Sequence, residues 1–177
     1  MKAQWISDHE WTRIQHLLPI VCVDVLSVRF APGTRQIDAL GLILRETPHQ
    51  GQRWCLVGGR MAYDESLGEA IARHLFDTLG QNIQFQVRDD QQPIFVAQYL
   101  PGARAGFPLD PRKHAVALTY CLEIGGSPVP QHEAIAFDWF SPDRLPLPDE
   151  FGFEQNLVVD ACLERLMGQH AVRQRTE

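Results

Sequence analysis

The sequence predicts an α/β/α sandwich, in which helices cover a mixed β-sheet, and three observations lead to this prediction. Segments with the patterns of strands outnumber helical segments, and several of them follow one another directly. The helical segments are few and spaced along the chain. A length of 177 residues with 45% hydrophobic content suits one core and is short for two.

Helix and strand signals alternate along the chain. Ser7 and Glu10 have the spacing of a capping box and predict an N-terminal helix that ends at Pro19, while Gly80 predicts the end of a second helix. We expect helices over residues 8–17, 65–79 and 154–167, and strands over residues 20–29, 39–45, 53–57, 83–88, 93–100, 114–124 and 134–140. This order divides the chain into an N-terminal helical extension (1–18), a main domain (19–146) and a C-terminal helix with its tail (147–177).

Composition and charge limit the classes of partner. The formal net charge is −6 and no run of Lys or Arg could track a phosphate backbone, so we expect no nucleic-acid polymer as a partner. A mononucleotide derivative needs only two or three cations. The four cysteines are widely separated in apolar runs, which favours reduced core residues and a cytoplasmic protein. No apolar stretch suits a signal peptide or a membrane span, so we expect neither secretion nor a membrane partner.

A glycine loop followed by a helix carries the functional prediction. The segment 59–80 resembles the Nudix box, which reads glycine, five residues, Glu, seven residues, Arg-Glu, an aliphatic residue, any residue, Glu-Glu, any residue and glycine. The residues that keep their places are Gly59, Glu65, Arg73, Leu75 and Gly80. This resemblance implies a Nudix domain over residues 19–146 and a hydrolase of a nucleoside diphosphate linked to another group.

The same box departs from the pattern at its acidic positions. His74 stands where the box has Glu, and Asp77-Thr78 replaces the Glu-Glu pair. In the family these carboxylates hold Mg²⁺ or Mn²⁺ against a diphosphate, because hard oxygen ligands suit a hard cation. Glu69, Arg73 and Asp77 still form a polar stripe at i, i+4 spacing. Without the preceding glycine loop, the stripe would indicate a solvated helix face carrying ion pairs.

The wider segment 19–80 is similar to the GDP-mannose mannosyl hydrolase branch of the Nudix superfamily. The matching features are Pro19–Asp24, Leu44-Arg45, Gly51, Trp54 and Gly58–Arg60. Enzymes of that branch also carry a degenerate box, cleave at the sugar carbon and use one Mg²⁺. The resemblance implies that Arg45, Arg60 and Arg73 contact the diphosphate or assist departure of the leaving group. The glutamate that the branch keeps for its metal falls at Thr78 here.

A loop before the last strand completes the implied site. Gln131-His132-Glu133 resembles the loop in which that branch holds a further metal ligand and a catalytic histidine. His132 is either a general base or an exposed loop histidine. The resemblance thus implies His132, Glu133 and Arg73 as catalytic residues, Arg45, Arg60 and Gly59 as substrate-binding residues, and Glu65, Asp77 and Glu133 as metal ligands, with His74 as a possible further ligand.

Several alternatives stay open at this stage. Arg45 could end a strand beside Glu46 instead of contacting a phosphate. The alternative to a hydrolase is a domain that has lost catalysis and binds a nucleotide-like ligand or a protein partner, which the substituted box supports. Homodimer formation is a further possibility, since three residues could cover either an interface or the monomer core: Trp5, Trp11 and Leu157. The remaining candidates are expected to pack in the core: Trp54, Trp139 and Cys55.

Overall fold

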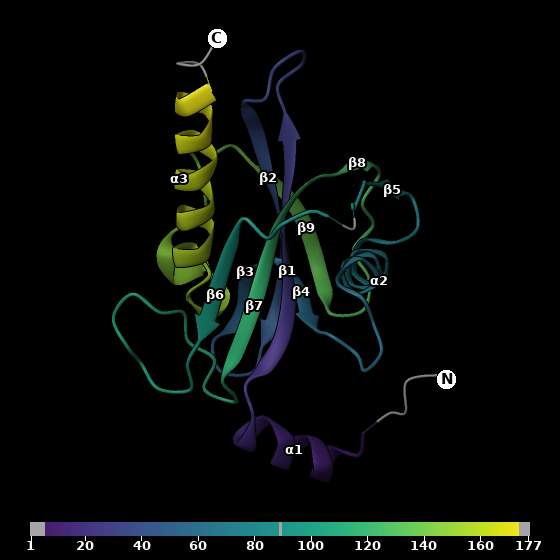
Figure 1. The fold of residues 1–177 in the computed structure, drawn as a ribbon, viewed down its shortest axis with the longest axis vertical. Helices are drawn as coiled ribbons and strands as arrows, with labels where there is room; N and C mark the ends of the chain where they lie inside the picture. Colours follow the sequence, from purple (N-terminus) through teal and green to yellow (C-terminus); the bar gives the residue numbers. More distant parts are fainter. Residues whose placement is uncertain (1–5, 89, 174–177) are drawn as a thin grey trace.

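A seven-stranded mixed sheet forms the centre of the computed structural model, which describes residues 6–88 and 90–173 (Figure 1). The strands are β1 (Ile20–Phe30), β2 (Ile37–Thr47), β3 (Gly51–Cys55), β4 (Val57–Arg60), β6 (Phe95–Tyr99), β7 (Ala115–Glu123) and β9 (Ala134–Phe140). The helices are α1 (Asp8–Leu17), α2 (Leu67–Leu79) and α3 (Asn156–Arg173), with short 3-10 turns at Pro148–Glu150 and Gly152–Glu154. The predicted α/β sandwich is therefore confirmed.

The sheet divides beside strand β1, and this division creates the space for a site. The main order is β3-β2-β1-β7-β6, with β1 and β7 parallel. Residues 27–30 of β1 pair with β2, whereas residues 22–25 pair with β4. Because β3 pairs with β2 and β4 with β1, the two sheet halves part at Leu56. The sequence predicted one strand here, and the structure has two, broken at that residue.

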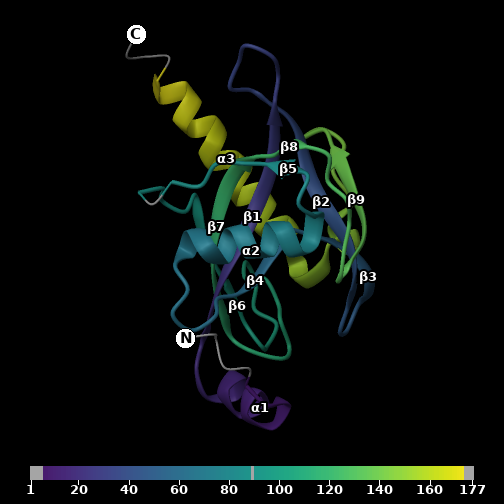
Figure 2. The ribbon, with the colours of Figure 1, turned by 90° about the vertical axis from the view of Figure 1, so that its right-hand side faces the viewer.

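Helices α2 and α3 lie on opposite sides of the sheet, and α1 lies at the end from which β1 starts (Figures 1 and 2). Fully buried side chains from β1, β2 and the two covering helices meet the sheet: Val23, Val25, Leu26, Val28, Leu40, Leu42, Ile43, Ile71, Leu75, Leu79 and Val158. Each such side chain contributes about 1.5–3 kcal/mol when fully buried, so the strands that carry the site are firmly held.

Helix α2 begins two residues later than predicted because Ser66 is its N-cap. The Ser66 side chain accepts from the Glu69 N–H, and the Glu69 carboxylate accepts from the Ser66 N–H at 2.8 Å. Gly80, with a φ of 79°, ends the helix, as the sequence predicted. Glu69 thus caps the helix, and it does not pair with Arg73.

Most other predicted elements are present, with shifted ends. Helix α1 and strand β9 have the predicted bounds, whereas the strand expected over residues 83–88 shortens to β5 (Ile83–Gln84). Strand β5 pairs with β8 (Gly125–Gly126), which the sequence did not predict. Helix α3 runs beyond its predicted end at residue 167. No helix among the described residues has the length and apolar character needed to cross a membrane.

The aromatic and cysteine predictions hold where the structure describes them. Three of the four cysteines are buried, and the fourth, Cys121, is partly buried. The side chains of Trp54 and Trp139 are partly buried against the core. Trp11 and Leu157 are also partly buried, and Trp5 lies outside the described residues.

Candidate functional site

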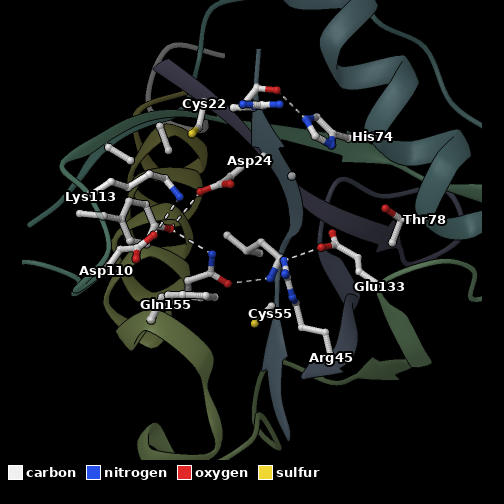
Figure 3. Close-up of a pocket in the computed structure, with 18 of the residues that line it drawn as sticks. Cys22, Asp24, Arg45, Cys55, His74, Thr78, Asp110, Lys113, Glu133 and Gln155 are labelled. Carbon is white, nitrogen blue, oxygen red and sulfur yellow. Dashed lines mark hydrogen bonds and ion pairs between the residues drawn. The ribbon is translucent and has the colours of Figure 1, made fainter. Parts of the chain in front are cut away.

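A cavity of about 620 Å³ opens where the two halves of the sheet part. Eight of the nine residues proposed from the sequence line it: Arg45, Gly59, Arg60, Arg73, His74, Asp77, His132 and Glu133. Glu65 does not line it. Figure 3 shows two groups of side chains, with His74, Thr78, Arg45 and Glu133 on the side of α2, and Asp24, Lys113, Asp110 and Gln155 on the side of α3. We name them the α2 side and the α3 side of the cavity.

Glu65 joins the glycine loop to helix α2. Arg73 donates from Nε and Nη2 to the two Glu65 carboxylate oxygens, at 2.6 and 2.8 Å, and the Ala62 N–H donates to Glu65 at 2.7 Å. The hydrogen bonds from Arg73 lower the pKa of Glu65. Arg73 also donates to the Arg60 carbonyl at 3.0 Å. Both oxygens of Glu65 are therefore engaged within the loop.

His74 fills the position of a box glutamate and supports the same loop. Its Nε2 lies 3.0 Å from the Arg60 carbonyl oxygen, which can only accept, so Nε2 carries the proton. Burial lowers the pKa of His74 and favours the neutral ring. A Cβ at Gly59 would lie 2.7 Å from His74 Cε1, so the ring needs a glycine beside it.

Arg45 and Glu133 bridge two distant segments on the α2 side. Arg45 Nη1 lies 2.8 Å from Glu133 Oε2, and both side chains are partly exposed to the cavity. Buried Arg45 Nε has no hydrogen-bond partner among the described residues. The Gln131 N–H donates to the Thr78 carbonyl at 2.9 Å, which holds the loop against α2. This loop therefore presents Glu133 to the cavity from beside α2.

The same loop bends at His132, whose φ of 51° lies in the left-handed region. Such a conformation is uncommon for residues other than glycine, although histidine is enriched there. His132 is exposed and lines the cavity next to Glu133. Both residues of this pair can therefore meet a solvent molecule at the cavity rim.

A buried chain of hydrogen bonds forms the α3 side. The Leu56 N–H donates to Gln155 Oε1 at 2.8 Å, Gln155 Nε2 donates to the Tyr99 hydroxyl at 3.1 Å, and that hydroxyl donates to Asp24 Oδ2 at 2.9 Å. Burial raises the pKa of Asp24 to about 6. These hydrogen bonds connect Leu56, where the two halves of the sheet part, to the Asp24 carboxyl group, whose pKa of about 6 is near neutrality.

A cluster of charged side chains also lines the α3 side of the cavity. Lys113 Nζ lies 3.0 Å from Asp110 Oδ2, and Arg112 donates to the same carboxylate at 2.8 Å. Burial opposes ionisation of Asp110, but the hydrogen bonds from Arg112 and the charge of Lys113 outweigh it and lower its pKa to about 2. One carboxylate is paired with two cations, so this group adds one net positive charge to the cavity wall.

The functional residues predicted from the sequence include none of the α3 side. One signal was available, because Asp24 is a lone carboxylate inside the apolar run 20–26. Tyr99 and Gln155 carry no such signal, since only the folded chain brings them to Asp24. Two successive residues with left-handed φ, Phe153 at 57° and Glu154 at 56°, form the bend that leads into Gln155.

The side chains present do not fit the metal centre of a complete Nudix box. Across the described ranges 6–88 and 90–173, no three His, Cys, Asp or Glu side chains come together in an arrangement that could hold a metal ion. Glu65 is bound to Arg73, and Glu133 is paired with Arg45. Asp77 alone among the proposed carboxylates lines the cavity without such an ion pair.

Comparisons with known proteins find a matching family and similar structures. A family model described as a domain of unknown function (DUF4916) matches residues 1–164. A possible asymmetric diadenosine tetraphosphate hydrolase from Jonesia denitrificans DSM 20603 is 29% identical, with a TM-score of 0.77 over 85% of this chain and 96% of that chain. No curated protein matches the sequence.

Two more distant structures share the fold. A MutT Nudix hydrolase from Burkholderia pseudomallei is 21% identical, with a TM-score of 0.59 over 81% of this chain and 98% of that chain. A bifunctional NMN adenylyltransferase/ADP-ribose pyrophosphatase from Francisella tularensis, complexed with AMP and a Mn ion, is 18% identical, with a TM-score of 0.61 over 89% of this chain and 45% of that chain. The fold is that of Nudix hydrolases.

Proposed function

The chain belongs to the family described as a domain of unknown function (DUF4916), and from this premise we propose that it is a Nudix-type hydrolase of a nucleoside diphosphate linked to another group. One observation carries the proposal. Arg45, Arg60 and Arg73, which come from β2, β4 and α2, line a single cavity on a Nudix fold. A guanidinium group is a cation with several N–H donors that match phosphate oxygens, so three of them suit a diphosphate, although the Nε and Nη2 of Arg73 are bound to Glu65.

The diphosphate would lie on the α2 side of the cavity. Gly59 also lines the cavity, and the His74 ring fills the space that a side chain at this position would take. Arg73 remains cationic while bound to Glu65, because its pKa is raised by that hydrogen-bonded partner. Arg45 would exchange Glu133 for a phosphate oxygen, which is also an anionic acceptor. The three arginines would then stabilise the charge on the departing diphosphate.

That exchange gives Glu133 and His132 a chemical role. Once Arg45 binds phosphate, the Glu133 carboxylate is released beside His132 at the cavity rim. As the water oxygen bonds to the sugar carbon, the bond from that carbon to the diphosphate oxygen breaks and the diphosphate departs. Either Glu133 or His132 can accept the proton of this water, which is the role of a general base. The pair is thus the proposed centre of water activation.

The group linked to the diphosphate would occupy the α3 side, and we propose a sugar. A hydroxyl both donates and accepts hydrogen bonds, and this side offers an acceptor in Asp24 and a donor in Lys113. The walls beside them are small, at Cys22, Ala115 and Ala117. The similarity of segment 19–80 to the GDP-mannose mannosyl hydrolase branch supports the same substrate class.

No metal step is assigned in this proposal. Asp77 and Glu133 are the two proposed carboxylate ligands that line the cavity, and among the described residues no group of three His, Cys, Asp or Glu side chains could hold Mg²⁺ or Mn²⁺. The Mn ion in the Francisella tularensis structure belongs to a protein that shares only the fold at 18% identity. The proposal therefore assigns neutralisation of the diphosphate to arginine.

A second candidate, ligand binding without catalysis, is favoured by a specific observation. Two box positions that normally carry glutamate hold His74, bound to a carbonyl, and Thr78, which is buried. A domain with this helix could keep the arginines and bind a nucleotide without cleaving it. The two candidates share the same cavity and differ in turnover.

Product analysis separates the candidates. Purified protein is incubated with nucleoside diphosphate sugars, dinucleoside polyphosphates and nucleoside diphosphates, each with Mg²⁺, Mn²⁺ or EDTA, and products are resolved by anion-exchange chromatography. Free sugar with intact nucleoside diphosphate indicates attack at the sugar carbon, whereas a nucleoside monophosphate indicates attack at phosphorus. Binding without any product supports the second candidate, and absence of both binding and product refutes the two.

A further inference from the structure

Helix α1 reaches the cavity wall through Trp11. The centre of the Trp11 ring lies 4.2 Å from Cζ of Arg60, which is the geometry of a cation–π contact. Arg60 lines the cavity, and Trp11 packs partly buried against the core. The N-terminal helix therefore touches a side chain to which the proposed function assigns a phosphate contact.

The backbone of Arg60 is held by other residues. Its carbonyl accepts from Arg73 Nη2 and from His74 Nε2, each at 3.0 Å, and its Cα pairs with that of Cys22 in the sheet. These contacts fix the point from which the side chain starts. The Trp11 ring contacts the far end of the side chain.

We propose that Trp11 is a positioning residue that holds the Arg60 guanidinium ready for a diphosphate, and that α1 is thereby part of the substrate site. This inference rests on the proposed function. An arginine side chain loses rotamer freedom when it is fixed. A guanidinium group that is already ordered by an aromatic face loses less of that freedom on binding, so affinity rises.

Two features of α1 agree with this role. None of its residues is fully buried, and Leu17 at its end is 70% exposed, so the helix contributes little to the core. The family match nevertheless begins at residue 1 and includes the whole helix. A helix that adds little to the core but belongs to the family domain is consistent with a function at the site.

The expected effect follows from the strength of the contact. A cation–π contact at a partly exposed site is worth about 0.5–1 kcal/mol, which corresponds to a roughly 2- to 5-fold change in affinity. Trp11→Leu keeps apolar bulk and removes the aromatic face, whereas Trp11→Phe keeps a face. Leu17→Ala, on the same helix and exposed, is the matched control.

Titration calorimetry with GDP and with inorganic pyrophosphate tests the inference. We expect Trp11→Leu to bind both probes about 2- to 5-fold more weakly than wild type, and Trp11→Phe and Leu17→Ala to bind within about 2-fold of it. In an Arg60→Met background, Trp11→Leu should cause no further loss, because its effect passes through Arg60. Thermal unfolding of each variant confirms that the comparison is made between folded proteins.

The outcomes are distinguishable. Equal binding by wild type and Trp11→Leu, or a loss that persists in the Arg60→Met background, overturns the inference and leaves the proposed function intact. If the wild type binds neither GDP nor inorganic pyrophosphate, the proposed function is overturned, and the inference with it. If Trp11→Leu does not fold, loss of binding by more than 5-fold in folded Trp11→Phe also overturns the inference, because that variant keeps the aromatic face.

Discussion

Replacing Asp24 with Asn should stabilise the protein at neutral pH. Asp24 is buried, and burial raises its pKa from the ordinary 3.8 to about 6. The folded state therefore binds a proton more tightly than the unfolded state does. The Tyr99 hydroxyl can still donate to an amide oxygen, so Asn keeps the hydrogen bond and removes the buried charge.

The sign and magnitude follow from linkage. Between pH 3.8 and about 6 the folded state holds more protons, so the stability that Asp24 contributes in its protonated form is lost as the pH rises through this window. The difference in pKa corresponds to about 3 kcal/mol, at roughly 1.4 kcal/mol for each pH unit. We expect Asp24→Asn to exceed wild type by up to about this amount at pH 7 to 8 and to lose the advantage near pH 4.

Urea unfolding of both proteins at intervals from pH 4 to pH 8 gives the two free energies of unfolding. Asp38→Asn, at an exposed position in β2, is the control and should track wild type at each pH. The reasoning is refuted if Asp24→Asn is less stable than wild type at pH 7. It is equally refuted if the difference between the two proteins does not change with pH.

Three further substitutions test the glycine loop and the proposed base. Gly59→Ala places a Cβ 2.7 Å from His74 Cε1, and differential scanning calorimetry should show a loss of about 1–3 kcal/mol; unchanged stability would contradict the packing. Glu65→Gln removes the carboxylate that fixes Arg73 and should cost about 1–3 kcal/mol in chemical unfolding, and a neutral result would argue against its structural role. Glu133→Gln should lower turnover of an identified substrate by about 10²- to 10⁴-fold while GDP binding persists, and an unchanged steady-state rate would exclude Glu133 as base.

Local chemistry made much of the fold predictable. Ser7 and Glu10 mark the start of α1, and the apolar residues Ile71, Leu75 and Leu79, which recur at i, i+4 spacing in α2, are fully buried. The end of α2 at Gly80 also follows from one residue. Such signals act within a few residues, so the sequence displays them directly.

Long-range pairing was not predictable in the same way. The break at Leu56 depends on β1 pairing with β2 and with β4 along different halves, and nothing in segment 53–57 marks it. Strand β8 consists of Gly125–Gly126, and it forms only because β5 lies beside it. The pattern of one segment does not record the partner that another segment supplies.

The residues of the candidate site also differ in whether the sequence could predict them. The Nudix resemblance named the residues of the α2 side, and the structure brings Arg45 and Glu133 together across 88 positions of sequence. The resemblance did not reveal that Glu65 is bound to Arg73, since that ion pair depends on how the loop turns back onto α2. Asp24 reaches Tyr99 only through the packing of β1, β7 and β6.

The central claim is that arginines of this cavity, without a metal ion, hold the diphosphate. Calorimetric titration of GDP into wild type, Arg45→Met and Arg53→Met, all in EDTA, tests it most directly. Arg53 is the control, because it lies opposite Arg45 in the register of β2 and β3 but does not line the cavity. The account predicts binding by wild type and Arg53→Met, and a loss of roughly 10- to 100-fold in Arg45→Met, the size expected for charge-assisted hydrogen bonds. No binding by wild type in EDTA, or equal losses in the two variants, would contradict it.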